Sequence, residues 1–317
     1  MTKTAVLFPG QGSQYIGMGK DFFDEFEVSK EVFLEADRVL NMDLSRIIFF
    51  SDEEELQKTE NTQPAILTTS IAILRALEDR GIDYDYLAGL SLGEYSALVS
   101  AGVFDFKEAV DIVRKRGQFM EGALPSGSGA MAAILGLKAE MLETLLENSR
   151  DRGFISVANY NCPGQIVLTG GVEAIEKALI EAKLLGAKKA VKINVSGPFH
   201  SSMLELAGEE LREELLKLDI RQAKKKIVSN VDAKFVEDKS EVIEKLVKQV
   251  SSSVLFQQSI ELLLEEGVDT FIEVGPGKSL TGFVKRTAKA LKLDIKTFNI
   301  ETVDSFRETV KLLKEDK

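Results

Sequence analysis

The sequence is poor in the residues that form disulfides and zinc sites. Its 317 residues include one cysteine, Cys162, one histidine, His200, and no tryptophan. A single cysteine excludes an internal disulfide and agrees with a reducing cytoplasm, which is the location we expect. One histidine and one cysteine are poor material for zinc bound by nitrogen and sulfur, and no carboxylate cluster suggests magnesium. We therefore expect no metal site.

Long apolar runs and an excess of basic charge are also missing. No uncharged apolar run reaches the roughly 18 residues that a membrane helix needs, and the N-terminal stretch has no apolar segment of signal-peptide length. The 40 basic residues are outnumbered by 51 acidic ones, a net charge of −11. We expect neither a membrane nor nucleic acid as a partner. Anionic small ligands stay possible, because local fields can oppose the net charge.

The composition is that of a folded protein, and its pattern is that of an α/β fold. Apolar residues make up 44% of the chain and charged residues 29%, and the length suggests about two domains. Apolar runs and helical spacing alternate along it. They predict strands at 4–8, 86–88 and 270–274, a helix over 63–80 that has Pro64 near its start, and helices after residues 91 and 277. This alternation predicts a largely parallel sheet.

The stretch from Gly129 to Val195 follows a different order. It reads strand, helix, strand, strand, helix, strand, which is the ferredoxin-like βαββαβ signature. A linker rich in glycine and serine, residues 125–129, precedes it. We therefore predict a small ferredoxin-like domain over 125–196, inserted into a large discontinuous α/β domain over 1–124 and 197–317. The cleft between the two is the expected ligand site.

One short motif carries a specific chemistry. Gly89 to Gly93 reads G-x-S-x-G, follows a predicted strand and opens a predicted helix, as a nucleophile elbow does. Such a turn exposes the Ser91 hydroxyl, and the Leu92 N–H at the helix N-terminus faces a developing oxyanion. An ordinary glycine-rich turn with a capping serine explains the same five residues, so both interpretations stay open.

A serine nucleophile needs a base, and His200 is the single histidine available. It lies in a predicted loop at a domain junction, where site residues often occur. A histidine without any role is the alternative. No third member of a triad can be recognised, because Glu205 and Glu209 read as a solvated helix face and a carbonyl can orient an imidazole instead.

Two further segments have a functional and an ordinary interpretation. The loop from Pro9 to Gln14 is not a dinucleotide fingerprint, because Tyr15 stands where the third glycine belongs. The loop could provide a second hydrogen-bond donor to the oxyanion, or it could be an ordinary tight turn after an edge strand. Residues 114–117, Arg-Lys-Arg-Gly, are predicted to end a helix that begins near Lys107. An arginine there binds an anionic acyl group if it points into the cleft, because its fork suits a carboxylate.

Polar residues near the turn of the inserted unit are a weaker signal. Asn159 and Asn161, with Gln165 after them, could form polar walls of a ligand site. Turn chemistry explains them nearly as well.

Six ordered blocks of sequence resemble one enzyme family. They are GQGSQ, GLSLGEYSAL, RGQFM, VANYNCPGQIVLTG, GPFHSSML and EVGPGKSLTGFVKR, and they extend over essentially the whole chain. In this order they resemble the malonyl-CoA:acyl-carrier-protein transacylases of type II fatty acid synthesis. The resemblance implies an α/β-hydrolase-like core with an inserted ferredoxin-like subdomain. It also implies transfer of a malonyl group from malonyl-CoA to the phosphopantetheine thiol of an acyl carrier protein, with no cofactor.

The resemblance also assigns roles to individual residues. It makes Ser91 the acylated nucleophile and His200 its base, oriented by the main-chain carbonyl of Gln249. It implies that the N–H groups of Gln11 and Leu92 form the oxyanion hole. The substrate-binding residues would be Arg116 as clamp for the malonyl carboxylate and Phe199 as selector against methylmalonyl. We add Asn159 to the substrate-binding residues as a polar wall, on its residue type and not on the resemblance.

Two departures from the family pattern stand out. Leu90 replaces the usual histidine of the elbow, and Ser251 to Ser253 replace an Asn-Pro block. The first leaves the nucleophile and base in place but puts the supporting contacts at that position in doubt. The second implies a different local turn.

Other functions and partners stay under consideration. A serine thioesterase or esterase, an acyltransferase of polyketide synthesis and a non-catalytic carrier-binding module are the alternatives. An acidic carrier protein would need a basic patch on this acidic chain, and two are candidates. One consists of Lys188, Lys189 and Lys192, the other of Lys285, Arg286 and Lys289. We expect a monomer.

Overall fold

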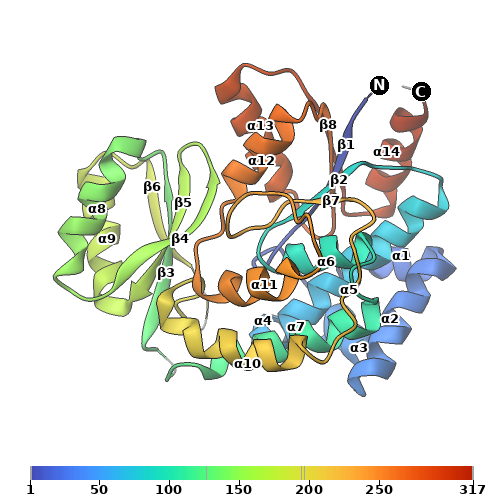
Figure 1. Ribbon diagram of the computed structural model, residues 1–317, viewed down its shortest axis with the longest axis horizontal. Coiled ribbons are helices and arrows are strands. Elements are labelled where there is room, and N and C mark those ends of the chain that lie inside the picture. The colour runs from blue at the N-terminus through green and yellow to red at the C-terminus, as the bar shows by residue number, and fades with distance from the viewer. Residues whose placement is uncertain (1, 126, 194, 196, 316–317) are drawn as a thin grey trace.

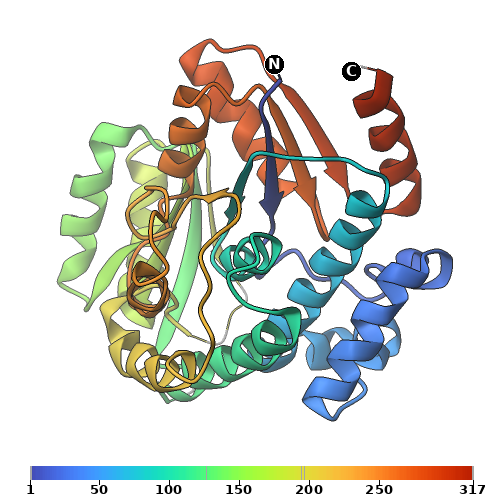
Figure 2. The same cartoon turned by 45° about the vertical axis from the view of Figure 1, so that its right-hand side comes forward.

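The computed structural model describes residues 2–125, 127–193, 195 and 197–315. Residue 126 of the predicted linker and the predicted domain boundary at residue 196 lie outside this range. Two β-sheets organise the rest, one parallel and one antiparallel (Figure 1). In both views the antiparallel sheet lies at one end of the molecule and the N-terminal helices lie toward the other (Figure 2). The structure is therefore mixed α/β.

The larger sheet is parallel throughout, as the alternating pattern predicted. Its strands run in the order β7-β2-β1-β8-β9. They are β1 (Thr4–Phe8), β2 (Tyr86–Gly89), β7 (Lys226–Ile227), β8 (Thr270–Val274) and β9 (Lys296–Ile300). In the register of β1 and β2, Phe8 lies opposite Gly89. The loops that follow these two strands therefore leave the same edge of the sheet side by side, and this edge carries the site.

The second sheet is antiparallel and has the strand order β4-β5-β3-β6. Its strands are β3 (Gly129–Leu135), β4 (Ile155–Cys162), β5 (Gln165–Gly171) and β6 (Lys189–Ile193). Its two helices, α8 (Leu142–Arg150) and α9 (Val172–Leu184), cover the face turned away from the rest of the molecule (Figure 1). A short 3₁₀ helix, Ala139–Met141, precedes α8. The predicted order of six elements is confirmed.

Helices cover both faces of the parallel sheet. Before the antiparallel sheet come α1 (Lys20–Glu25), α2 (Glu27–Leu40), α3 (Leu44–Phe50), α4 (Glu53–Gln57), α5 (Thr59–Asp79), α6 (Leu92–Ser100) and α7 (Phe106–Gly122). After it come a 3₁₀ helix (Ser202–Leu204), α10 (Glu205–Leu215), α11 (Glu241–Ser251), α12 (Phe256–Glu265), α13 (Ser279–Leu291) and α14 (Val303–Glu315). Alternate residues of β1 enter different cores: Val6 and Phe8 on one face, Ala5 and Leu7 on the other. In the described part of the chain, no helix has the length and apolarity to cross a membrane.

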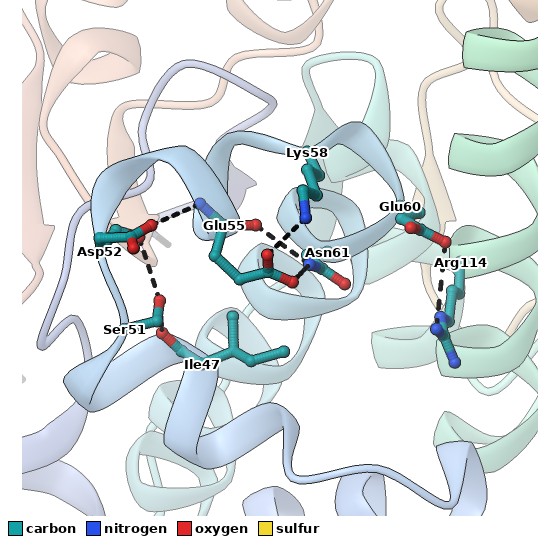
Figure 3. A network of polar contacts seen from close by, with 8 residues as sticks. All are labelled: Ile47, Ser51, Asp52, Glu55, Lys58, Glu60, Asn61 and Arg114. Atoms are coloured by element: carbon teal, nitrogen blue, oxygen red, sulfur yellow. Dashed lines mark hydrogen bonds and ion pairs between the residues drawn. The ribbon is translucent and has the colours of Figure 1, made fainter.

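Two predicted helix boundaries are wrong. Helix α5 begins at Thr59, so Pro64 lies inside it. Its first turn is polar and is tied to α4, with Asn61 donating to Glu55 (Figure 3). Apolar spacing therefore did not reveal this turn.

The helix that was predicted to end at 114–117 continues to Gly122 as α7. Gly117 lies inside it because α5 crosses there. A Cβ at Gly117 would lie 2.7 Å from the carbonyl oxygen of Thr59. Close helix packing, and not helix termination, explains this glycine.

Candidate active site

Ser91 lies at a sharp turn between β2 and α6. Its backbone angles are φ 53° and ψ −105°, outside the regions that L-residues normally occupy. Such a conformation is held only where the surroundings enforce it, and it is common at catalytic sites. Two glycines make the turn possible. A Cβ at Gly89 would lie 1.9 Å from the carbonyl carbon of Gly93, and a Cβ at Gly93 would lie 2.1 Å from the Phe8 carbonyl oxygen. The glycines of the motif thus serve close backbone approach.

Side chains hold the backbone groups on both sides of the strained residue. The Ser91 N–H donates to Asn230 Oδ1 at 2.7 Å, and the Ser91 carbonyl accepts from Gln249 Nε2 at 3.0 Å. Asn230 in turn donates to the Gly89 carbonyl at 2.7 Å. The turn is therefore fixed by residues that lie more than 130 positions further along the chain.

His200 meets Ser91 as the sequence predicted. Its Nε2 lies 2.7 Å from Ser91 Oγ, and its Nδ1 lies 2.8 Å from the main-chain oxygen of Gln249. A carbonyl oxygen only accepts, so Nδ1 carries the proton and Nε2 is free to accept one from the serine. Glu205 and Glu209 lie on exposed positions of α10, away from this pair. The imidazole is oriented by a carbonyl and not by an acid.

The imidazole is kept neutral. Burial, together with the nearby positive charge of Arg116, lowers the pKa of His200 to about 4. The hydrogen bond to the Gln249 carbonyl acts in the opposite direction but does not offset burial. At neutral pH the base is therefore unprotonated and ready to accept a proton.

Arg116 is buried, with 1% of its surface exposed, and reaches the serine. Its Nη2 donates to Ser91 Oγ at 3.2 Å and to Gln249 Oε1 at 2.9 Å, and its Nη1 donates to Gln63 Oε1 at 2.7 Å. The guanidinium also lies over the ring of Tyr95, 5.4 Å from its centroid. A positive charge among neutral groups is thus held beside the nucleophile.

The two neighbouring basic residues of α7 face elsewhere. Arg114 lies 3.9 Å from Glu60 on α5, a contact visible in Figure 3. Lys115 pairs with Asp111 and Glu214, each at 2.8 Å. Of the three residues, Arg116 alone points into the site, because helical spacing turns consecutive residues to different faces.

A second buried charge lies behind the serine. Glu94 is 1% exposed, and its carboxylate accepts from Gln249 Nε2 at 2.6 Å and from the Asn230 N–H at 3.3 Å. Burial raises the pKa of Glu94 to about 7, and these hydrogen bonds limit the rise. The carboxylate is therefore connected to Arg116 through one side chain, that of Gln249.

The reacting groups open into a cavity of about 260 Å³. Ser91, His200 and Arg116 line it together with the other residues singled out from the sequence. Those residues are Gln11, Leu92, Asn159 and Phe199, with Leu90, Asn161 and Gln165. Apolar side chains complete the wall, among them Met131 and Val167 from the antiparallel sheet and Phe283 from α13. Gln249 lies behind the wall and acts through its hydrogen bonds.

Three supporting residues were missed by the sequence analysis. Glu94 lies within the elbow block, two residues after Leu92, but its burial is visible only in the structure. Gln63 was within the predicted helix, and nothing in its spacing marked it. Asn230 follows the two-residue strand β7, which no apolar pattern announces.

The chain matches the family described as "Acyl transferase domain" over residues 6–305. It is 49% identical to the malonyl CoA-acyl carrier protein transacylase of Bacillus subtilis, over 98% of each chain. Among solved structures, that of the corresponding transacylase from Clostridium perfringens has a TM-score of 0.94 and 45% identity, covering 99% of this chain and 98% of that one. A complex of a type II polyketide acyl-carrier protein with its malonyl-transacylase has a TM-score of 0.94 and 37% identity, covering 98% and 99%. The chain belongs to the acyl transferase domain family.

Proposed function

We propose that this protein transfers the malonyl group of malonyl-CoA to the phosphopantetheine thiol of an acyl carrier protein, through a malonyl ester of Ser91. One observation carries the proposal: a buried guanidinium, that of Arg116, lies 3.2 Å from the oxygen of an activated serine. The carboxylate of a malonyl group is separated from its thioester carbonyl by one methylene. It therefore reaches Arg116 when the carbonyl carbon lies at Ser91 Oγ. The names of the relatives support the same activity.

In the first half-reaction, Ser91 Oγ attacks the thioester carbonyl as its proton passes to His200 Nε2. The tetrahedral oxyanion accepts hydrogen bonds from the N–H groups of Gln11 and Leu92, both at the cavity wall. Removing one such donor typically slows acyl transfer about 10² to 10³-fold. The C–S bond then breaks, and the proton on His200 passes to the departing thiolate. Free CoA and malonyl-Ser91 result.

The second half-reaction runs the same steps in reverse with another thiol. The carrier-protein thiol gives its proton to His200 and attacks the ester carbonyl of malonyl-Ser91. The C–O bond breaks and Ser91 Oγ takes the proton back. Side chains, backbone N–H groups and the two substrates supply every group in these steps, so the proposed mechanism uses no cofactor. Ping-pong kinetics follow.

The acyl pocket selects for a carboxylate. An acetyl group has no carboxylate, so its binding leaves the buried Arg116 without an anionic partner, which costs free energy. Such an unpaired polar group favours malonyl over acetyl more strongly than the loss of one methylene contact would. Phe199, buried against the cavity, restricts the space beside the acyl chain. Asn159 offers an amide to the polar part of the substrate.

We further propose that two domains, 1–124 with 197–317 and 125–196, enclose the substrate. The first is α/β-hydrolase-like and the second ferredoxin-like. The strand order β4-β5-β3-β6, antiparallel throughout, supports the ferredoxin-like assignment. The cavity is lined by strands of the antiparallel sheet and by the loops and helices that follow strands of the parallel sheet, which supports a site between the domains. We expect the monomer to be the active form.

A thioesterase would use the same Ser91–His200 pair, so the acceptor must be tested. Purified protein and the Ser91→Ala variant are mixed with malonyl-CoA or acetyl-CoA and their intact masses measured. We expect a malonyl adduct on the wild type alone, which holo carrier protein discharges and water does not. Rapid loss to water would indicate a thioesterase. No adduct at all would indicate a carrier-binding module and would contradict the mechanism.

A further inference from the structure

We propose that Glu94 is a positioning residue for Arg116, acting through the side-chain amide of Gln249. The inference rests on the proposed function, because it assigns the residue that sets the acyl selectivity of that same site. Glu94 lies on α6 and Arg116 on α7, and the two are joined by a residue of α11. Three helices thus meet at one amide.

The orientation of this amide follows from the chemistry of its neighbours. A carboxylate and a carbonyl oxygen only accept hydrogen bonds, and a guanidinium only donates. Gln249 Nε2 donates one hydrogen to Glu94 at 2.6 Å and the other to the Ser91 carbonyl at 3.0 Å. Its Oε1 must then face Arg116, where the two atoms lie 2.9 Å apart. Both ends of the amide thus have partners, and Nε2 also lies 3.4 Å from Asn230 Oδ1.

Glu94 holds this amide in its orientation together with the Ser91 carbonyl and Arg116, and it makes the shortest of the three contacts. Without an acceptor at that position, one hydrogen of Nε2 is left in a buried site, and a rotated amide would turn Nε2 toward the guanidinium. Two donors facing each other repel, so Arg116 would move from Gln249 and from Ser91 Oγ. The main-chain carbonyl of Gln249 is unaffected by the amide, so His200 keeps its partner.

The site therefore separates two tasks in one residue. The main chain of Gln249 orients the base, and its side chain orients the clamp. Loss of Glu94 should disturb the orientation of Arg116 and leave the orientation of His200 unchanged. This split distinguishes a positioning role from general support of the fold, which would lower the reaction of every acyl group alike.

The test compares two variants. Glu94→Met has a side chain of similar length but no hydrogen-bond acceptor, whereas Glu94→Gln keeps an acceptor oxygen. Acylation of Ser91 by malonyl-CoA and by acetyl-CoA is followed by intact mass at about pH 8.5, above the pKa of Glu94 of about 7. For E94M we expect kcat/KM with malonyl-CoA to fall about 10 to 30-fold and the acetyl rate to change less than about 3-fold. For E94Q we expect both within about 3-fold of wild type.

The matched control is Glu273→Gln on β8. Glu273 is also a buried carboxylate, but it accepts from the backbone N–H groups of Leu280 and Thr281. We expect it to leave the malonyl-to-acetyl ratio within about 2-fold of wild type, whatever it does to thermal stability. Equal losses for both acyl groups in E94M, no loss in E94M, or a loss in E94Q as large as in E94M would each overturn the proposal.

Two further experiments test the proposal if E94M folds poorly, and test whether the effect of Glu94 depends on Arg116. Gln249→Met keeps the carbonyl to His200 but removes the amide from both Arg116 and the Ser91 carbonyl, so kcat/KM with malonyl-CoA should fall at least as far as in E94M. In an Arg116→Ala background, E94M should change the malonyl-to-acetyl ratio no further; an additional drop would contradict action through Arg116.

A crystal structure of E94M separates failure of this inference from failure of the proposed function. The guanidinium position is read there whatever the substrate is. Gln249 Oε1 still facing an unmoved Arg116 would overturn the positioning role. A wild-type protein without preference for malonyl would instead overturn the proposed function.

Discussion

Ser91 and His200 are both held in backbone conformations that L-residues rarely adopt. Ser91 has φ 53° and His200 has φ 58°, although neither is glycine. Strain of this kind persists where surrounding contacts enforce it, and here hydrogen bonds from Asn230 and Gln249 do so for the serine. The short contact between Ser91 and His200 is thus set before any substrate arrives, which lowers the reorganisation that the reaction requires.

Because the pKa of His200 is lowered, we predict that the acylation rate does not fall as the pH is lowered from neutral to mildly acidic. The base works when neutral, and a group with a pKa of about 4 is neutral at every pH above roughly 5. We expect kcat/KM for acetyl-CoA, which has no carboxylate to bind Arg116, to change less than about 2-fold between roughly pH 8 and 5.5.

The measurement is a pH profile of single-turnover acylation, with the fold monitored by circular dichroism at each pH. A histidine at its ordinary pKa of 6.5 would instead lose about ten-fold by roughly pH 5.5. Such an acidic limb, with the protein still folded, would show that burial does not hold the imidazole neutral.

At this scale the sequence predicted the pair Ser91 and His200, which the structure brings into contact, and missed the residues that hold this pair. Ser91 and His200 were found because one motif and one histidine left little choice. The carbonyl of Gln249 and the clamp role of Arg116 came from the family resemblance. Asn230 and Glu94 act through contacts between segments far apart in the chain, which local pattern does not encode.

At the scale of elements, the elbow depends on how closely α6 approaches β1. The Phe8 carbonyl oxygen lies where a side chain at Gly93 would begin, so the first turn of α6 packs directly on the end of the strand. This contact sets the distance between the serine turn and the loop that carries Gln11. The second glycine of the motif is thus a spacer between two elements.

We expect Gly93→Ala to destabilise the protein by about 1–3 kcal/mol and to lower acylation at least ten-fold. The added methyl lies 2.1 Å from a carbonyl oxygen and forces α6 away from β1. Thermal unfolding and adduct formation measure the two effects.

Gly282→Ala is the matched control. It lies within α13 with nothing within 4 Å of a Cβ, so alanine there should stabilise by about 0.4–1 kcal/mol. An unchanged Gly93→Ala enzyme would mean that this approach of α6 to β1 is not needed.

Element types were predictable from the sequence, and element ends were less so. The strand at Thr4–Phe8 and the six elements after Gly129 were correct because their apolar periods are clear. The first turn of α5 and the last turns of α7 were missed. Polar buried residues begin α5, and Gly117 looked like a helix end although it marks a helix crossing.

At the scale of the whole molecule, the two sheets are joined near the cavity by a polar contact. Arg286 on α13 donates to Gln165 Oε1 on β5 at 2.7 Å, and Gln165 lines the cavity. Of the two basic patches, the one that contains Arg286 therefore adjoins the route to Ser91. An acidic partner that delivers a thiol into this cavity would meet Lys285 and Lys289 on the same exposed helix face.

Charge reversal on that face should weaken use of the carrier protein and spare use of CoA. For Lys285→Glu with Lys289→Glu, we expect KM for holo carrier protein to rise about 10-fold at low salt and less at high salt. Discharge of malonyl-Ser91 by CoA should stay within about 2-fold. Lys311→Glu with Lys314→Glu on α14 makes the same change in net charge at another helix and should leave both acceptors unaffected. An equal effect from the two pairs would mean that net charge matters and that α13 is not the docking face.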